Sequence, residues 1–292
     1  MYDLIFLHAP SVYDFRERAT LWGPISDLVP STPVFEMYPI GFATMLAYLQ
    51  QRGYQVRIAN LAARMVRSDR FDPARLIDQL EARAYGIDLH WLPHAHGALE
   101  VAQRVKVRHP DSPVILGGYS ATYFHRELIA NPVVDYVLRG DSTEEPLAQL
   151  MECLLEGREP RHVANLTWKD RLGEVHVNPL TYVPDTLDSL TLDTRPVVRS
   201  VVRDRDLHNY IPFSHWLEYP IMASLTVKGC TQNCTICGGS AFAGRHVFGR
   251  SRPAHRSPEM LAEDVRRMGA LSRAPVFLLG DLRQAGMDYA RR

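Results

Sequence analysis

The sequence has few cysteines, no surplus of either charge and no long apolar run, and each absence excludes a class of protein. Only four Cys occur in 292 residues, three of them within eight positions, whereas a secreted disulfide scaffold uses more and spreads them along the chain. Thirty-three basic residues balance 33 acidic ones, so a basic surface that coats nucleic acid is not expected. No apolar run reaches the length of a membrane span, and no basic segment precedes the first apolar run as in a signal peptide. We therefore expect a cytoplasmic protein without a membrane span.

The first 157 residues alternate short apolar runs with amphipathic stretches. Five strands separated by helices favour a parallel sheet covered on both faces, and right-handed crossovers make it an open doubly wound sheet. The predicted strands are 4–7, 56–59, 85–89, 114–116 and 133–138, and the clearest helices are 40–51, 76–80, 99–107 and 144–155.

A doubly wound sheet binds its ligand beyond the C-terminal ends of the strands. The segments that follow the predicted strands are 8–10, 88–96, 117–120 and 139–141. No G-x-G-x-x-G follows the first strand, so a dinucleotide is not favoured. Gly117 and Gly118 instead let a flat or bulky group approach the backbone, or they form a tight strand-to-helix turn.

Four segments in this order resemble the cobalamin-binding domain that precedes radical S-adenosylmethionine (SAM) enzymes. They are 39–41, 51–56, 109–122 and 134–141. The resemblance implies a flavodoxin-like strand order, with the corrin lying across the C-terminal strand ends. It assigns to cobalamin contact Pro10, His90, Gly117, Gly118, Tyr119, Ser120, Gly140 and Asp141.

The histidine-rich loop 88–96 leaves three interpretations open. Asp88 and His90 match the start of the D-x-H-x-x-G motif of carriers with a lower His ligand, but Pro93 stands where the motif has Gly. His90 is therefore a candidate cobalt ligand, although cobalamin domains of the radical group commonly lack one. His90, His94 and His96 form a candidate site for a separate metal. The third interpretation is a polar loop that borders the crevice.

Residues 158–219 lack the alternation of the first segment. Residues 163–168 and 175–177 flank a polar turn and predict a hairpin. No strong periodicity appears between about 184 and 218, which indicates a linker that packs across a second domain. The arginine-rich run 195–205 either meets a phosphate or forms a solvated face.

Three cysteines with C-x3-C-x2-C spacing follow a predicted strand at 221–227. Thiolates bind iron–sulfur clusters, and three of them on a [4Fe–4S] cube leave one iron open for a small ligand. The three candidate ligands are Cys230, Cys234 and Cys237. A zinc site is the alternative and requires a fourth ligand, for which Cys153 and His246 are candidates.

This motif resembles that of the radical SAM superfamily. The resemblance implies that the cluster binds SAM through its open iron. Ile236 stands where relatives have an aromatic residue near the adenine, and the strand 276–279 ends at Gly280 and Asp281, where relatives contact the methionine amine. A strand-terminating turn is the alternative role for Asp281.

Together these patterns predict three segments: a cobalamin-binding domain at 1–157, a hairpin and linker at 158–219, and the start of a partial (β/α) radical SAM barrel at 220–292. The implied cofactors are a [4Fe–4S] cluster, SAM and cobalamin, with flavodoxin or ferredoxin as electron donor. The implied reaction is reductive cleavage of SAM, with methyl transfer to an unactivated carbon of an unidentified small-molecule or peptide substrate.

The segment after the cysteine motif is shorter than a complete radical SAM barrel. A radical SAM barrel needs roughly 200 residues at barrel proportions, and 55 follow Cys237. The chain therefore resembles a protein truncated within its barrel, and we expect no SAM cleavage by these residues alone. The alternatives are a non-catalytic corrin- and cluster-binding module that needs a partner, and a zinc-stabilised binding protein.

Overall fold

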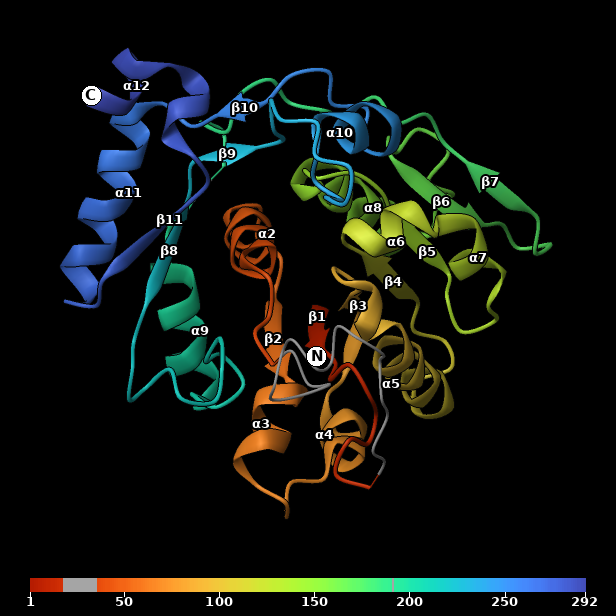
Figure 1. Ribbon diagram of the computed structural model, residues 1–292. Helices are drawn as coiled ribbons and strands as arrows, with labels where there is room; N and C mark the ends of the chain where they lie inside the picture. Colours follow the sequence, from red (N-terminus) through yellow and green to blue (C-terminus); the bar gives the residue numbers. More distant parts are fainter. Residues whose placement is uncertain (18–35, 191) are drawn as a thin grey trace.

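A seven-stranded sheet organises the first part of the chain in the computed structural model, which describes residues 1–17, 36–190 and 192–292 (Figure 1). Its order is β2-β1-β3-β4-β5-β6-β7. The first five strands are parallel, in the flavodoxin-like order 2-1-3-4-5, so the predicted fold class is confirmed. They are β1 (Tyr2–His8), β2 (Val56–Asn60), β3 (Ala82–Asp88), β4 (Val114–Gly117) and β5 (Tyr136–Leu138).

Helices cover both faces of this sheet because its strands are apolar on both sides. Ile5 and Leu7 face one buried cluster, whereas Leu4 and Phe6 face the other. The helices are α2 (Ile40–Gln51), α3 (Leu61–Arg67), α4 (Pro73–Gln79), α5 (Ala95–Arg108), α6 (Tyr119–Tyr123), α7 (His125–Ala130) and α8 (Glu144–Glu156). The 3-10 turn η1 (Leu92–His94) precedes α5.

The predicted hairpin is present, and it extends the sheet of the first part of the chain. Its strands are β6 (Leu166–Lys169) and β7 (Val175–Val177), and β6 pairs antiparallel with β5. Trp168 is fully buried and donates its indole N–H to Asn178 Oδ1 at 3.1 Å. The hairpin thus covers the edge of β5, which would otherwise expose unpaired backbone groups.

The segment expected to pack across a second domain packs on both parts of the chain: Leu187 and Leu190 pack with Ala254, whereas residues 195–212 pack on the first part. It also contains a helix that periodicity did not predict. This helix, α9 (Arg195–Asp204), packs against α2. Tyr210 enters the same buried cluster as the apolar residues of α2, and Asn60 Nδ2 donates to the carbonyls of Ile211 and Pro212 at 3.1 and 3.0 Å. The prediction failed because Val198 and Val202 are exposed on this helix, which obscures its apolar face.

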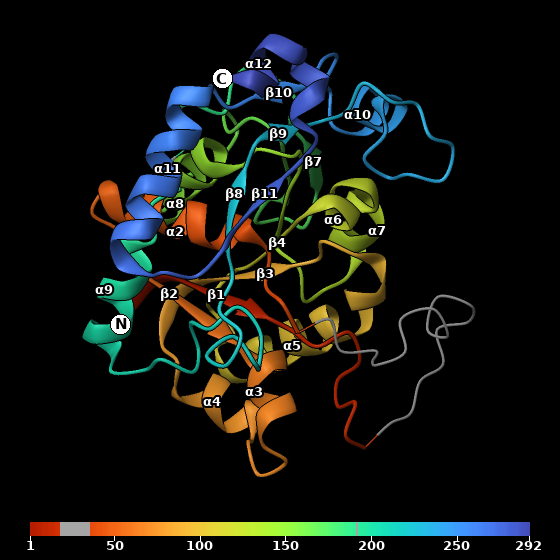
Figure 2. The same cartoon turned by 60° about the vertical axis from the view of Figure 1, so that its left-hand side comes forward.

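The last part of the chain contains a parallel pair of strands, β8 (Met222–Leu225) and β11 (Val276–Leu279). Helix α11 (Pro258–Leu271) lies beside both strands (Figure 2), and Ser257 caps it, accepting from Met260 N at 3.4 Å. A short antiparallel pair joins β9 (Val227–Lys228) to β10 (Ala254–His255). The remaining elements are α10 (Ala241–Val247), the 3-10 turn η2 (Leu282–Ala285) and α12 (Met287–Arg291).

None of the helices in the described ranges has the length and apolar character needed to cross a membrane.

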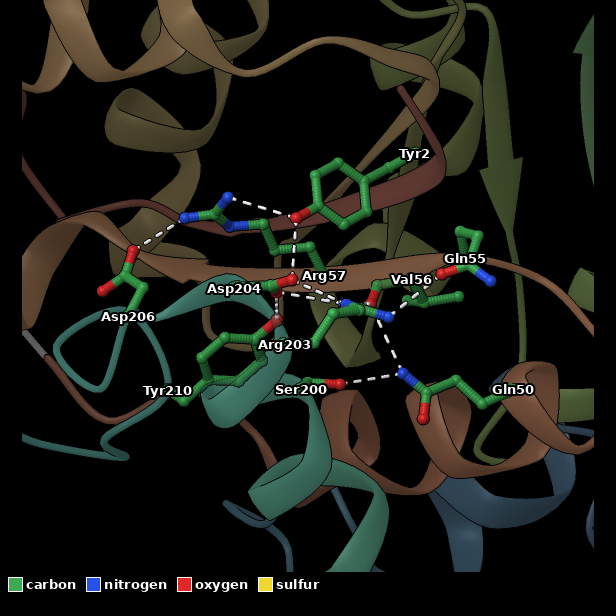
Figure 3. Close-up of polar contacts among 10 residues, drawn as sticks. All are labelled: Tyr2, Gln50, Gln55, Val56, Arg57, Ser200, Arg203, Asp204, Asp206 and Tyr210. Atoms are coloured by element: carbon green, nitrogen blue, oxygen red, sulfur yellow. Dashed lines mark hydrogen bonds and ion pairs between the residues drawn. The ribbon is translucent and has the colours of Figure 1, made fainter.

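A buried carboxylate holds α9 against the sheet (Figure 3). Asp204, with 1% of its side chain exposed, accepts a hydrogen bond from Tyr2 OH at 2.9 Å and another from Tyr210 OH. Arg203 donates to both carboxylate oxygens, at 2.6 and 3.0 Å. Burial alone would raise the pKa of Asp204, but the bonds from Arg203 and the two tyrosines outweigh burial and lower it.

We predict that Asp204→Ala lowers the free energy of unfolding by about 3 kcal/mol, because it leaves buried donors without an acceptor. The folded-state pKa lies below the unfolded value of about 3.9, so this stabilisation is complete above that pH and is lost as pH falls through the folded-state pKa. Urea titrations from neutral pH to pH 3 measure the difference, which should narrow below about pH 4. The exposed Asp111→Ala is the control; equal losses for the two variants would contradict this role.

Candidate functional site

The loops that follow the parallel strands meet at one edge of the sheet. The backbone N–H of Ser120 and its hydroxyl both donate to His90 O at 3.2 Å, which ties the loop after β4 to the loop after β3. Gly97 N donates to Ser11 O at 3.1 Å, and Gly140 N donates to Thr122 Oγ1 at 2.9 Å. The structure therefore brings together at this edge the eight residues assigned to cobalamin from the sequence.

Packing within the protein accounts for Gly118. Its φ is +114°, and a Cβ there would lie 2.8 Å from the backbone of Leu89 and His90. The requirement for glycine thus comes from the neighbouring loop, as in the tight-turn interpretation, and not from a ligand at the Cβ position. At Gly117 a Cβ would make only an ordinary contact, 3.8 Å from Leu138 O. A contact between either glycine and cobalamin remains a prediction.

Aromatic rings form a row across this edge. The centroid of the His90 ring lies 4.8 Å from that of Tyr119, which in turn lies 4.6 Å from that of Phe248. Burial, together with the negative charge of Asp141, raises the pKa of Tyr119 to about 12, so the phenol remains protonated at neutral pH. Trp91 and Leu92 are about half exposed beside this row, at 51% and 52%.

The histidines group differently from the sequence-based hypothesis. His90 packs on Tyr119 and His96 Nδ1 accepts from Tyr13 N at 3.3 Å, so His90, His94 and His96 do not converge. Instead, potential ligand atoms of His8, Asp88 and His94 lie within 4.8 Å of one another, in a buried group that could hold a divalent ion. Burial, followed by repulsion from His8, lowers the pKa of His94 to about 4.

Asp88 binds His8 beneath the same edge. His8 Nδ1 lies 2.8 Å from Asp88 Oδ1, and both side chains are buried. Burial would raise the pKa of Asp88, but the attraction of His8 and its hydrogen bond outweigh burial and lower it. His8 was expected at a strand end but was given no role. Its position directly after the apolar run 4–7 is the sequence feature that could have marked it as a site residue.

The cysteine loop follows β9 and presents three free thiols. Cys234 and Cys237 are exposed, whereas Cys230 is partly buried and its sulfur accepts from Gln232 N at 3.3 Å. Cys237 N donates to Cys234 O at 3.2 Å. These contacts curl the loop so that three sulfurs within eight residues are available as ligands.

The loop cysteines do not form a converged three-ligand group of the kind that holds a single ion. Among the described residues, two groups have three ligand atoms within 4.8 Å of one another, and neither includes a cysteine of the loop. A [4Fe–4S] cube takes each thiolate on a different iron, so the sulfurs need not converge on one point. Of the candidate fourth zinc ligands, Cys153 is buried in the core of the seven-stranded sheet, and His246 Nδ1 lies 2.9 Å from Phe242 O.

Gly280 and Asp281 lie beside this loop, as the SAM assignment requires. Gly280 has a φ of +123°, and a Cβ there would lie 2.4 Å from side-chain atoms of Thr226 and Val227. Gln284 Oε1 accepts from Thr231 N at 3.0 Å, which joins the turn after β11 to the cysteine loop.

The carboxylate of Asp281 is partly exposed and bonds to Arg283, which lowers its pKa. The bonds to Arg283 fit the alternative role of Asp281 in a strand-terminating turn. The exposed part of the Asp281 side chain is still accessible to a ligand. Ile236 is fully exposed, so its contact with adenine stays a prediction.

A buried ion pair joins the two parts of the chain. Arg250 donates to both carboxylate oxygens of Asp141, with 2.8 Å between Nη2 and Oδ1, and the side chains are 2% and 4% exposed. Arg250 Nη1 also donates to Pro184 O at 2.9 Å. Lys228 adds a hydrogen bond to Ser142 Oγ at 3.1 Å. Sequence reasoning missed Arg250 and Lys228, and it assigned Asp141 to cobalamin although both carboxylate oxygens bind Arg250.

Sequence comparison matches the first part of the chain to a known domain family and the chain to two distant relatives. The B12 binding domain family matches residues 28–150. Cytidylyl-2-hydroxyethylphosphonate methyltransferase of Streptomyces wedmorensis is 22% identical over 248 residues, covering 73% of this chain and 46% of the relative. Hopanoid C-3 methylase of Methylococcus capsulatus is 23% identical over 254 residues, covering 86% of this chain and 44% of the relative. The chain therefore spans less than half the length of these curated relatives.

Solved structures share the fold across nearly the whole chain. The radical SAM methyltransferase TsrM from Kitasatospora setae, with tryptophan and a SAM analogue bound, superposes with a TM-score of 0.69 at 14% identity, covering 100% of this chain and 50% of TsrM. The cobalamin-dependent radical SAM enzyme OxsB superposes with a TM-score of 0.61 at 12% identity, covering 96% of this chain and 34% of OxsB. The resemblance inferred from the sequence is confirmed: residues 28–150 match the B12 binding domain family, and the chain has the fold of solved cobalamin-dependent radical SAM enzymes.

Proposed function

We propose that this chain is the cofactor-binding part of a cobalamin-dependent radical SAM methyltransferase. The observation that carries the proposal is the juxtaposition of two sites: the cysteine loop, beside Gly280 and Asp281, is fixed by the Arg250–Asp141 pair against the strand-end edge of the B12-binding domain. When bound, a [4Fe–4S] cluster supplies a reducing electron to SAM, and cobalamin supplies methyl-transfer chemistry.

The strand-end edge fits a corrin. It offers the His90–Tyr119 pair with Trp91 and Leu92 exposed beside it, and an apolar, flat macrocycle would remove this surface from water. Ser11, in the loop after β1, is buried, and its hydroxyl has no hydrogen-bond partner among the described residues, so it is available to a polar group of the ligand. His90 packs its ring on Tyr119 at the border of the site, and we assign it there and not as a cobalt ligand.

The cysteine loop fits a cluster with one open iron. In this proposal Cys230, Cys234 and Cys237 are the cluster ligands, and the carboxylate of Asp281 accepts a hydrogen bond from the amine of SAM. Gly280 is required because a side chain there would collide with Thr226 and Val227. The aromatic contact Tyr119–Phe248 and the buried Arg250 exclude water between the two sites. An electron donor such as flavodoxin or ferredoxin in a reducing cytoplasm completes the proposal.

A non-catalytic corrin- and cluster-binding module is the second candidate. In the described part of the chain, β8 and β11 pair only with each other, so this portion builds one parallel pair of a barrel. Formation of 5′-deoxyadenosine from SAM above the level of a sample without protein would exclude the non-catalytic candidate, and it would also contradict the expectation that these residues alone do not cleave SAM.

The cluster assignment predicts that Cys230→Ala, Cys234→Ala and Cys237→Ala each lose the iron–sulfur cluster after anaerobic reconstitution, since a thiolate is removed from a site with three. The visible absorption of the cluster and the iron content per chain measure the loss. Cys153→Ala is the matched control and should keep a full cluster, because this cysteine is buried elsewhere in the core. Retention of a full cluster by any loop variant would show that its cysteine is misassigned.

The Arg250–Asp141 pair predicts strong coupling between its two residues. Arg250→Met or Asp141→Leu should each lower the local stability of residues 227–250 by about 3–5 kcal/mol, because a buried charge is left unpaired. The double variant should lose much less than the sum of the two, because it leaves neither charge. Hydrogen exchange of this segment measures all three variants. Additive losses would mean that the two side chains do not act as a pair.

A further inference from the structure

A cavity of about 410 Å³ lies between the end of β5 and helix α10. Its volume falls within the roughly 300–1,000 Å³ of small-molecule sites. The lining comes from four parts of the chain: the α6–α7 turn, the end of β5, the segment after β7, and the end of α10. The polar lining residues are Thr122, Tyr123, His125, Arg139, Arg245 and His246.

Arg139 contributes a buried guanidinium to this cavity without a carboxylate partner. Its side chain donates through Nη2 to Asn178 O, and only 7% of the residue is exposed. Its Nε has no hydrogen-bond partner among the described residues, and no Asp or Glu is among the described residues that line the cavity. The carboxylate of Asp141, two positions along the chain, is fully engaged by Arg250.

A buried cation without a counter-charge is unfavourable by several kcal/mol unless something compensates it. Burial, followed by repulsion from Arg126, lowers the pKa of Arg139 to about 10, so the guanidinium is still charged at neutral pH. The exposed Arg245 adds a second positive charge to the lining. His125 Nδ1 is engaged with Thr167 Oγ1 at 2.9 Å. Of the nearby acids, Glu127 acts on His125 but is not in the lining.

We propose that this cavity binds the anionic group of a small molecule, a phosphate, phosphonate or carboxylate, with Arg139 as the buried anchor and Arg245 at the rim. A planar guanidinium carries its N–H groups in the fork geometry that such oxyanions match. Two sources supply this chemistry: the phosphodiester of the cobalamin nucleotide tail, or the substrate. The first source rests on the proposed function, whereas the anion site itself does not.

Inorganic phosphate is the probe, used on the whole 292-residue chain without added cofactors. Thermal unfolding at constant ionic strength, with chloride as reference, should show a phosphate-dependent rise in Tm for the wild type. Arg139→Gln should weaken the affinity for phosphate at least tenfold, because a charged hydrogen-bond donor is lost. Arg245→Gln, on an exposed residue that cannot disturb the core, should weaken it roughly two- to fivefold.

Arg171→Gln is the matched control, since Arg171 is exposed in the β6–β7 turn, and should leave phosphate binding unchanged. Circular dichroism confirms that each variant is folded. The proposal is overturned if wild-type Tm does not respond to phosphate beyond chloride, or if Arg139→Gln and Arg245→Gln respond as the wild type does.

Cobalamin and cobinamide, which lacks the nucleotide tail, distinguish the two sources. If the nucleotide tail supplies the anion, Arg139→Gln weakens the affinity for cobalamin at least tenfold and leaves the affinity for cobinamide unchanged. If the substrate supplies it, phosphate binding falls while both corrins bind as in the wild type. A chain that binds neither corrin but still binds phosphate would refute the proposed function and leave the anion site standing.

Discussion

The Arg250–Asp141 ion pair determines how the two candidate cofactor sites face each other. Removing a guanidinium and a carboxylate from water is costly, and a buried pair is stable only when its geometry is bidentate and its other donors are satisfied. Both conditions hold here, because two N–H groups reach the carboxylate and a third reaches Pro184 O. The stem of Arg250 fills the space beside Gly229, where a Cβ would lie 2.6 Å from Arg250 Cδ. Gly229 directly precedes Cys230, so the start of the cysteine loop depends on this pair.

Two arginines near the same edge illustrate opposite electrostatic situations. Arg250 is buried with its counter-charge and joins two parts of the chain. Arg139 is buried without one and faces a cavity. Because an unpaired buried charge is unfavourable, we assign a structural role to the first arginine and propose ligand binding for the second.

Local patterns predicted the elements well but not their long-range partners. The five parallel strands and the cysteine loop follow apolar runs and spacing that a short window contains, whereas the order of the strands was implied by the family resemblance. The hairpin was recognised, but its pairing with β5 was not, because alternation does not identify the neighbouring strand. The docking of α9 depends on Asp204 meeting Tyr2, about 200 positions away, and the His8–Asp88–His94 group joins three separate segments. None of these contacts leaves a periodic signal.

The central claim is that one chain holds cobalamin and an iron–sulfur cluster close together across the interface fixed by Arg250 and Asp141. Electron paramagnetic resonance of cob(II)alamin, with the cluster reduced and then oxidised, measures this directly. Magnetic interaction should broaden the cobalt signal or speed its relaxation when the cluster is reduced, and the effect should vanish in the Cys230→Ala chain. A cobalt signal that is identical in both redox states, in a chain loaded with both cofactors, would contradict the account.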